Sequence, residues 1–148
     1  MKIKNGLLLG ILVSIVVIAG IASASMKISH RQIQVVSRPI QDKSDLIRVS
    51  NIIPNQKIQS PLNIAGEARG FWFFEATFLI KILDANGHII GETLAQAKND
   101  WMTNDFVPFE ARVNFEIPTT KTGILVLEKD NPSGLPENGD ELRIPIDF

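Results

Sequence analysis

The chain has 148 residues, of which 45% are hydrophobic and 21% charged, and it contains no cysteine. This length provides one domain and a leader, and the lack of cysteine excludes a disulfide scaffold, a thiolate zinc site, a cysteine nucleophile and an acylated lipoprotein. The formal net charge of −1 gives no support for a basic nucleic-acid-binding surface, so we expect no nucleic-acid partner.

Residues 1–24 have the pattern of a membrane-targeting segment. Two lysines precede a charge-free run over 5–26, whose apolar part covers 7–22. The Ala-Ser-Ala sequence that ends at Ala24 is the small-residue pattern of a signal-peptide cleavage site. The run is also close to the length of about 20 apolar residues that a spanning helix needs. We therefore expect one N-terminal hydrophobic helix, either a single-pass anchor in the cytoplasmic membrane with the C-terminal domain outside, or a signal peptide of a secreted protein.

Residues 25–45 are polar, with Lys, Arg, Gln and Ser interleaved among isolated Ile and Val. Pro39 opposes a continuous helix in this segment. The sequence predicts a polar tether. The alternative is an extra edge strand that contains Ile33, Val35 and Ile40.

After Asp45 the hydrophobic pattern changes to the period of two that is typical of strands. The clearest predicted strand runs from Trp72 to Ile82, with Trp72, Phe74 and every second residue after them facing the core. The sequence Asn86-Gly87 closes this strand as a tight hairpin. Further strands are predicted over 46–52, 62–69, 89–97, 109–117, 123–128 and 142–148.

These strands predict the fold class of the domain at 46–148. About seven short strands, with no helical period over three turns, favour an all-β, immunoglobulin-like, antiparallel two-sheet sandwich. Pro145 cannot donate to a strand ladder, so we expect the last strand at an edge or with that position facing outward.

The sequence offers little for catalysis. The two histidines, His30 in the tether and His88 after the hairpin turn, lie where side chains are solvated, and nucleotide-binding and serine-hydrolase motifs are missing. The acidic loop over 130–141 contains Asp130, Glu137, Asp140 and Glu141. We interpret it as a solvated turn; the alternatives are a calcium site or a hydrolase built on this loop. We expect no enzyme activity, no cofactor and no metal.

A run of aromatic residues is the most unusual feature. If Trp72 and Phe74 face the core, Phe71 and Phe73 face outward, an exposure that is typical of a partner surface. The alternative is that a bulge at Gly70 or a crossing loop covers them. Glu75 directly follows the aromatic run and is a candidate ion-pair partner of Arg69. Further aromatic residues are expected to cover one end of the sandwich. The candidate partner surface is therefore Phe71, Phe73, Glu75, Trp101 and Phe106.

A series of short motifs resembles the immunoglobulin-like domain of bacterial spore germination, the second Gmad type. The resemblance covers about residues 47–148, and its motifs occur in the family's order: Ile53-Pro54-Asn55, Ser60-Pro61-Leu62, Gly66-Glu67-Ala68-Arg69, Trp72-Phe73-Phe74-Glu75, Asp84-Ala85-Asn86-Gly87, Trp101-Met102, Phe106-Val107-Pro108-Phe109, Gly123-Ile124-Leu125-Val126-Leu127, Asn131-Pro132-Ser133-Gly134 and Ile144-Pro145-Ile146.

The resemblance implies an immunoglobulin-like sandwich in an exported, often membrane-anchored, bacterial envelope protein, and it carries over no catalytic residue. A second germination domain, which can accompany this one in spore formers, is missing from the sequence. We therefore expect a stand-alone, non-enzymatic binding or assembly module displayed on the envelope, with an envelope protein or a cell-wall polymer as its partner. The alternative is a domain that binds cell-wall carbohydrate or peptidoglycan, in which Trp101 or Trp72 stacks on sugar rings.

Overall fold

The computed structural model describes residues 42–148 as an all-β domain with two short 3-10 turns. The predicted leader at 1–24, and the tether up to residue 41 with its alternative edge strand, lie outside the described residues. Within 42–148, none of the helical turns is long and apolar enough to cross a membrane. The strands are β1 (Ile47–Val49), β2 (Gln56–Lys57), β3 (Leu62–Arg69), β4 (Thr77–Asp84), β5 (Ile89–Ala97), β6 (Phe106–Val113), β7 (Thr122–Glu128) and β8 (Glu141–Asp147), and the 3-10 turns are η1 (Gly70–Trp72) and η2 (Pro136–Asn138).

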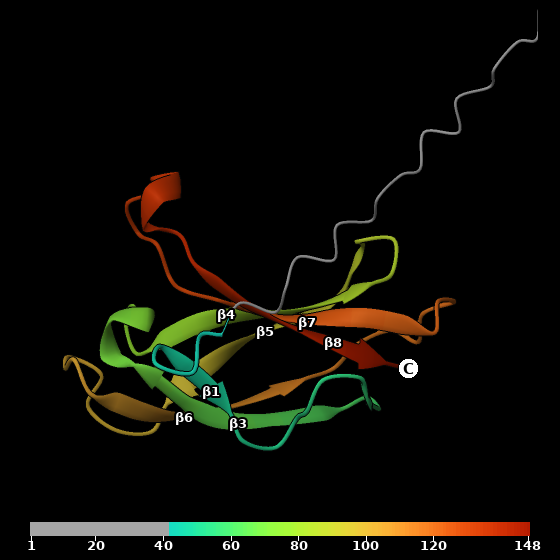
Figure 1. Ribbon diagram of the computed structural model, residues 1–148, viewed down its shortest axis with the longest axis horizontal. Helices are drawn as coiled ribbons and strands as arrows, with labels where there is room; N and C mark the ends of the chain where they lie inside the picture. The colour runs from blue at the N-terminus through green and yellow to red at the C-terminus, as the bar shows by residue number, and fades with distance from the viewer. Residues whose placement is uncertain (1–41) are drawn as a thin grey trace, which may run out of the picture. The chain divides into compact units, whose positions relative to one another are not determined.

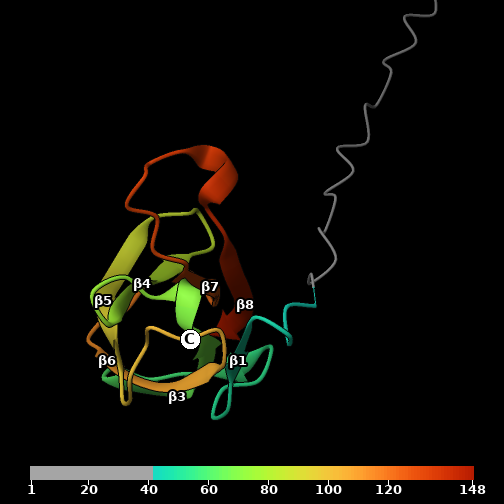
Figure 2. The same ribbon diagram turned by 90° about the vertical axis from the view of Figure 1, so that its left-hand side faces the viewer.

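The eight strands follow one hydrogen-bonded order, β1-β3-β6-β5-β4-β7-β8-β2. All neighbours are antiparallel except β2 and β8, which are parallel. The sheet curls on itself, so that β3 and β6 lie opposite β4 and β7 (Figures 1 and 2). The predicted all-β class is confirmed, but the expected separation into two purely antiparallel sheets is wrong. The additional strand is β2, which has only two residues.

The two halves of the curled sheet join where β5 meets β6. Only Gln96↔Glu110 and Ala97↔Phe109 are paired between these strands, and beyond the end of β6 the amide of Glu116 donates to the carbonyl of Ile90 at 3.0 Å. Alternation of hydrophobic residues with a period of two shows which face of a strand is buried, but it does not show which strand lies beside it. The sequence pattern therefore did not reveal this junction.

The core lies between the two halves. The rings of Phe78 on β4 and Phe109 on β6 meet edge to face, with centroids 4.9 Å apart. The inward alternation predicted for Phe78, Ile80 and Ile82 is confirmed, because all three are fully buried. Further buried residues come from both halves and from the segments between them, namely Ile47, Ile52, Ile58, Ile64, Val107, Val113, Leu125, Leu127 and Ile146.

Most predicted strand ranges are close to the observed ones, and two are displaced. The strands at 62–69 and 89–97 are confirmed residue for residue. The strand expected over 109–117 instead spans 106–113, and Ile117, expected to face inward, is 94% exposed. The strand expected from Trp72 begins at Thr77, because the chain before it forms η1 and a tight turn.

Candidate functional site

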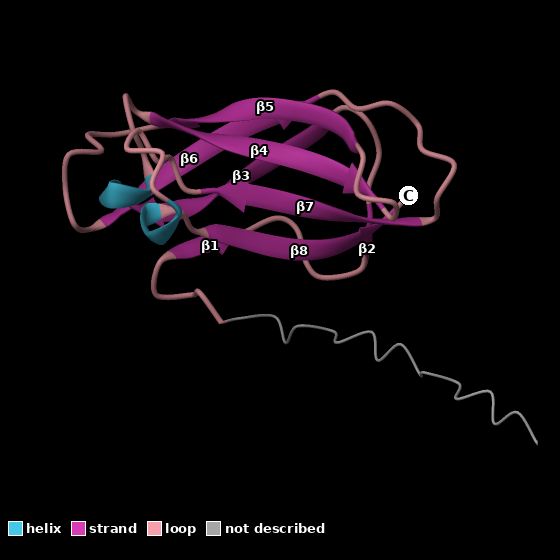
Figure 3. Cartoon of the chain, turned by 90° about the horizontal axis from the view of Figure 1, so that it is seen from above, coloured by secondary structure: helices cyan, strands magenta, loops and turns pink. Residues whose placement is uncertain are grey.

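Three connections gather at one end of the domain, which we call the aromatic end. They are residues 70–76 between β3 and β4, 98–105 between β5 and β6, and 129–140 between β7 and β8. Both 3-10 turns lie at this end (Figures 1 and 3). The amide of Gly70 donates to the carbonyl of Asp105 at 3.1 Å, and the amide of Asp130 donates to the carbonyl of Trp72 at 3.0 Å. Backbone hydrogen bonds therefore connect the three segments to one another.

Gly70 is the position that allows the close approach of two of these connections. A Cβ atom there would lie 2.0 Å from the carbonyl oxygen of Thr103 and 2.3 Å from that of Trp101. Only a residue without a side chain fits against these backbone atoms. The contact occurs directly after Arg69, the last residue of β3, and η1 begins at Gly70.

The 3-10 turn changes which aromatic side chains are exposed. A strand alternates its side chains between two faces, whereas a 3-10 turn has three residues per turn, so the expected in-and-out order is lost. Phe71 is 47% exposed and Trp72 is fully buried, as expected. Phe73, expected on the surface, is 4% exposed, and Phe74, expected in the core, is 42% exposed. The placement of Phe73 in the candidate surface is therefore wrong.

A two-residue turn at Glu75-Ala76 directs the chain into β4. Phe74 and Thr77 exchange backbone hydrogen bonds of 3.0 Å, and the two residues between them have φ angles of 48° and 64°. Positive φ at both central residues defines a type I′ turn, which strongly prefers Asn-Gly. Here Glu and Ala adopt this conformation at a cost in backbone strain. The turn leaves Phe74 and Glu75 exposed next to each other.

Phe74 contacts an aromatic residue of the next connection. Its ring meets that of Trp101 edge to face, with centroids 6.5 Å apart and an interplanar angle of 66°. Trp101 is half-buried, and Met102 beside it is 76% exposed. We call Phe71, Phe74, Trp101 and Met102 the aromatic patch. Phe74 and Met102 were not identified from the sequence, although the Trp101-Met102 pair was visible there as a motif.

The other predicted aromatic residue of this region, Phe106, is enclosed by two cations of the domain itself. The guanidinium groups of Arg48 and Arg69 lie 4.2 and 4.1 Å from its ring centroid. Arg69 also donates to the backbone carbonyls of Asp45 and Asn104 at 2.9 and 3.3 Å. The ion pair expected between Glu75 and Arg69 is not formed. Phe106 therefore has a structural role next to the aromatic patch.

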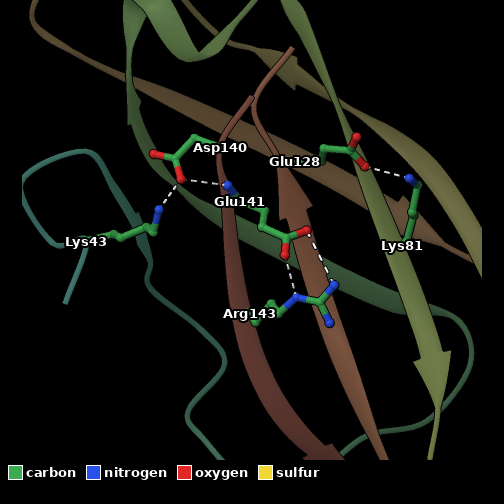
Figure 4. Close-up of polar contacts among 6 residues, drawn as sticks. All are labelled: Lys43, Lys81, Glu128, Asp140, Glu141 and Arg143. Carbon is green, nitrogen blue, oxygen red and sulfur yellow. Dashed lines mark hydrogen bonds and ion pairs between the residues drawn. The ribbon is translucent and has the colours of Figure 1, made fainter. Parts of the chain in front are cut away.

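The carboxylates at the end of the acidic loop pair with cations of the same chain. Asp140 binds the ammonium of Lys43 and accepts a hydrogen bond from the amide of Glu141 (Figure 4). Glu141 pairs with Arg143, with a shortest distance of 2.6 Å between nitrogen and oxygen. Residues 42–148 contain no group of three or more His, Asp or Glu side chains with metal-binding geometry. The Lys43 contact ties the end of the loop to the segment before β1, and the Glu141–Arg143 pair lies within β8.

The remaining carboxylates make the aromatic end negative. Its three connections contain six acidic residues and two lysines. Lys98 pairs with Glu110, and Asp140 pairs with Lys43. Lys129 donates to the carbonyl of Asn138 at 2.9 Å. Among the described residues, the other five acids form no ion pair, namely Glu75, Asp100, Asp105, Asp130 and Glu137.

His88 lies at the opposite end of the domain, in the turn between β4 and β5. Its ring is exposed, and its Nδ1 lies 3.3 Å from Oδ2 of Asp84. Burial raises the pKa of Asp84, but hydrogen bonds from His88 and Asn86 lower it more, so the net pKa lies below the usual 3.8. The carboxylate is a turn cap, because the amides of Asn86 and His88 donate to it at 2.8 and 2.9 Å.

The described residues form an all-β domain with one curled sheet, and the family model identifies its class as immunoglobulin-like. The family model described as the immunoglobulin-like domain of bacterial spore germination matches residues 46–135. The match covers more than half of the chain, and the chain belongs to this family. It confirms the resemblance seen in the motifs, although β8 lies beyond the matched range. No curated protein and no solved structure matches the chain.

Proposed function

We propose that this protein is a non-enzymatic binding or assembly module that recognises a partner through its aromatic patch. The concentration of exposed apolar side chains at one end carries the proposal. Of the eight large hydrophobic side chains that are exposed among the described residues, Phe71, Phe74, Met102 and Leu135 belong to the aromatic end. Exposed apolar side chains that gather in one region are typical of interaction sites, whereas scattered ones need no explanation.

The geometry of the patch supports binding. Phe74 is positioned by the Glu75-Ala76 turn and by its contact with Trp101, so little conformational entropy is lost when a partner contacts it. Strained backbone residues such as Glu75 and Ala76 concentrate at binding sites. Aromatic side chains and Met are enriched in protein interfaces.

Display on the envelope is the second part of the proposal. The apolar run at 7–22 would anchor or export the chain, and the polar residues from 25 up to the point where Lys43 enters the domain would separate the domain from the membrane. Cell fractionation with intact-mass analysis tests this part. A full-length chain in the membrane fraction supports an anchored module, and a chain that begins at Ser25 in the exported fraction supports a secreted one. A full-length chain in the cytosol would contradict both forms of display.

Site-specific photo-cross-linking of the full chain in its native cells tests the binding role. A photoreactive phenylalanine analogue is placed at Phe71, Phe74 or Met102. Matched controls place it at Leu94 and Ile117, which are also exposed and apolar but lie outside the aromatic end. We expect a discrete cross-linked product from the patch positions and none from the controls. Equal products from both sets would contradict the role of the patch.

A further inference from the structure

We propose that the aromatic patch binds a cationic side chain, arginine or lysine flanked by apolar residues, on a segment of a partner protein. This inference rests on the proposed function and specifies the chemistry of the partner. It depends on the charge distribution at the aromatic end and on the way in which the domain already binds its own arginines.

The charge of the aromatic end is complementary to such a segment. Five carboxylates there pair with no cation among the described residues, and they come from all three connections, as Glu75, Asp105 and Glu137 illustrate. Their combined negative potential attracts cations and speeds association with a basic partner. An acidic or strongly anionic partner would be repelled.

The aromatic rings provide the second element of recognition. The face of an aromatic ring carries negative electrostatic potential, and it attracts a guanidinium or ammonium group within about 6 Å of its centroid. Phe106 already binds Arg48 and Arg69 in this way, and both cation–π contacts of the described residues involve its ring. The domain therefore already contains an aromatic ring, beside the patch, that binds guanidinium groups.

Phe74 and Trp101 offer the same chemistry to an external cation. Their rings form a corner with an interplanar angle of 66°, and Glu75 directly follows Phe74. A cation in this corner would interact with two rings and with a carboxylate, while Phe71 and Met102 would contact its apolar neighbours. This combination favours arginine, which stacks on aromatic faces and forms bidentate bonds with carboxylates.

The test is photo-cross-linking from position 74 of the full chain in isolated envelopes. One variant neutralises the aromatic end with Glu75→Gln, Asp105→Asn and Glu137→Gln, none of which removes an observed ion pair. The control variant carries Glu92→Gln, Glu116→Gln and Asp147→Asn, which change the net charge equally outside the aromatic end. The cross-linked peptide is then identified by mass spectrometry.

We expect neutralisation of the aromatic end to lower the cross-linking yield by about fivefold or more, whereas the control variant stays within about twofold of the parent. Raising the salt concentration from 0.15 to 1 M should also lower the yield, because the Debye length falls from about 8 to 3 Å. The cross-linked partner peptide should contain arginine or lysine beside an apolar residue.

Two different failures are distinguishable. A discrete product that is insensitive to salt and neutralisation, that carries no basic residue at the contact, or that is a carbohydrate overturns the cationic-segment inference and leaves the patch as a binding site. No product at Phe71, Phe74 and Met102 above that at Leu94 and Ile117 overturns the proposed function and this inference together.

Discussion

The ammonium group of Lys43 and the carboxylate of Asp140, 97 residues apart in the chain, form an ion pair that ties the segment before β1 to the segment that leads into β8 (Figure 4). The Lys43 side chain is only 11% exposed. The carbonyl of the same residue accepts hydrogen bonds from the amides of Leu46 and Ile47, at 2.8 and 2.9 Å. Lys43 therefore fixes the point at which the chain enters the domain.

Replacement of Lys43 by methionine should lower the free energy of unfolding by about 1–2 kcal/mol, because Asp140 loses a charged hydrogen-bond partner in a half-buried position. Lys57→Met is the matched control, since Lys57 is exposed and forms no ion pair among the described residues; we expect a change within about 0.5 kcal/mol. Urea denaturation measures both. Equal effects of the two substitutions would show that the ion pair adds nothing to stability.

The strained turn at Glu75-Ala76 predicts a stabilising substitution. Ala76→Gly relieves about 1–2 kcal/mol of strain at φ 64° and costs less than about 1 kcal/mol of unfolded-state entropy, so we expect a net gain of about 0.5–1 kcal/mol. The reverse substitution, Gly87→Ala, should lower the free energy of unfolding by about 1 kcal/mol, because φ is 85° at this position although nothing lies near an added Cβ. Thermal denaturation of the two variants should therefore shift Tm in opposite directions, and a loss of stability in Ala76→Gly would exclude the assigned strain.

Neighbouring aromatic residues around η1 should respond in opposite ways to truncation. Phe73 is buried against Phe78, with ring centroids 5.2 Å apart, so Phe73→Ala should cost about 3–5 kcal/mol. Phe71→Ala removes an exposed ring and should change stability by less than about 1 kcal/mol while it weakens partner capture. Denaturation and the cross-linking assay together separate the two roles. A large stability loss in Phe71→Ala would place that ring in the core.

The sequence predicted the fold better than the candidate surface, for an identifiable reason. Period-two alternation reports burial wherever the backbone is extended, and it correctly identified the strands at 62–69 and 89–97. At Gly70 the backbone leaves the extended conformation because of a contact with a connection about 30 residues away, at Trp101 and Thr103. No local pattern encodes that contact. The predicted alternation therefore continued through η1, and it placed Phe73 on the surface and Phe74 in the core, the reverse of what the structure has. The contact between Phe106 and Arg69 likewise depends on the pairing of β3 with β6, which places these two residues opposite each other and which local alternation does not predict.

The turn between β4 and β5 should make stability depend on pH in the acid range. The pKa of Asp84 is lower in the folded domain than its usual 3.8, so ionisation of this carboxylate favours the folded state. Its contribution is complete above about pH 5, where the carboxyl is also almost fully ionised in the unfolded chain, and it is lost as the pH falls through the lowered folded-state pKa. Asp84→Asn should therefore be less stable than the parent at pH 6, and the difference should shrink as the pH falls below 4.

His88→Ala is the informative control for this pH dependence. It removes the exposed imidazole but keeps the backbone amide, which donates to Asp84 at 2.9 Å. We expect this variant to retain part of the acid-dependent stability that Asp84→Asn loses, because amides of the turn still stabilise the carboxylate. Urea midpoints at several pH values between 2 and 7 measure the effect. A difference between Asp84→Asn and the parent that stays constant over this whole range would show that Asp84 stabilises the turn without any contribution from its charge.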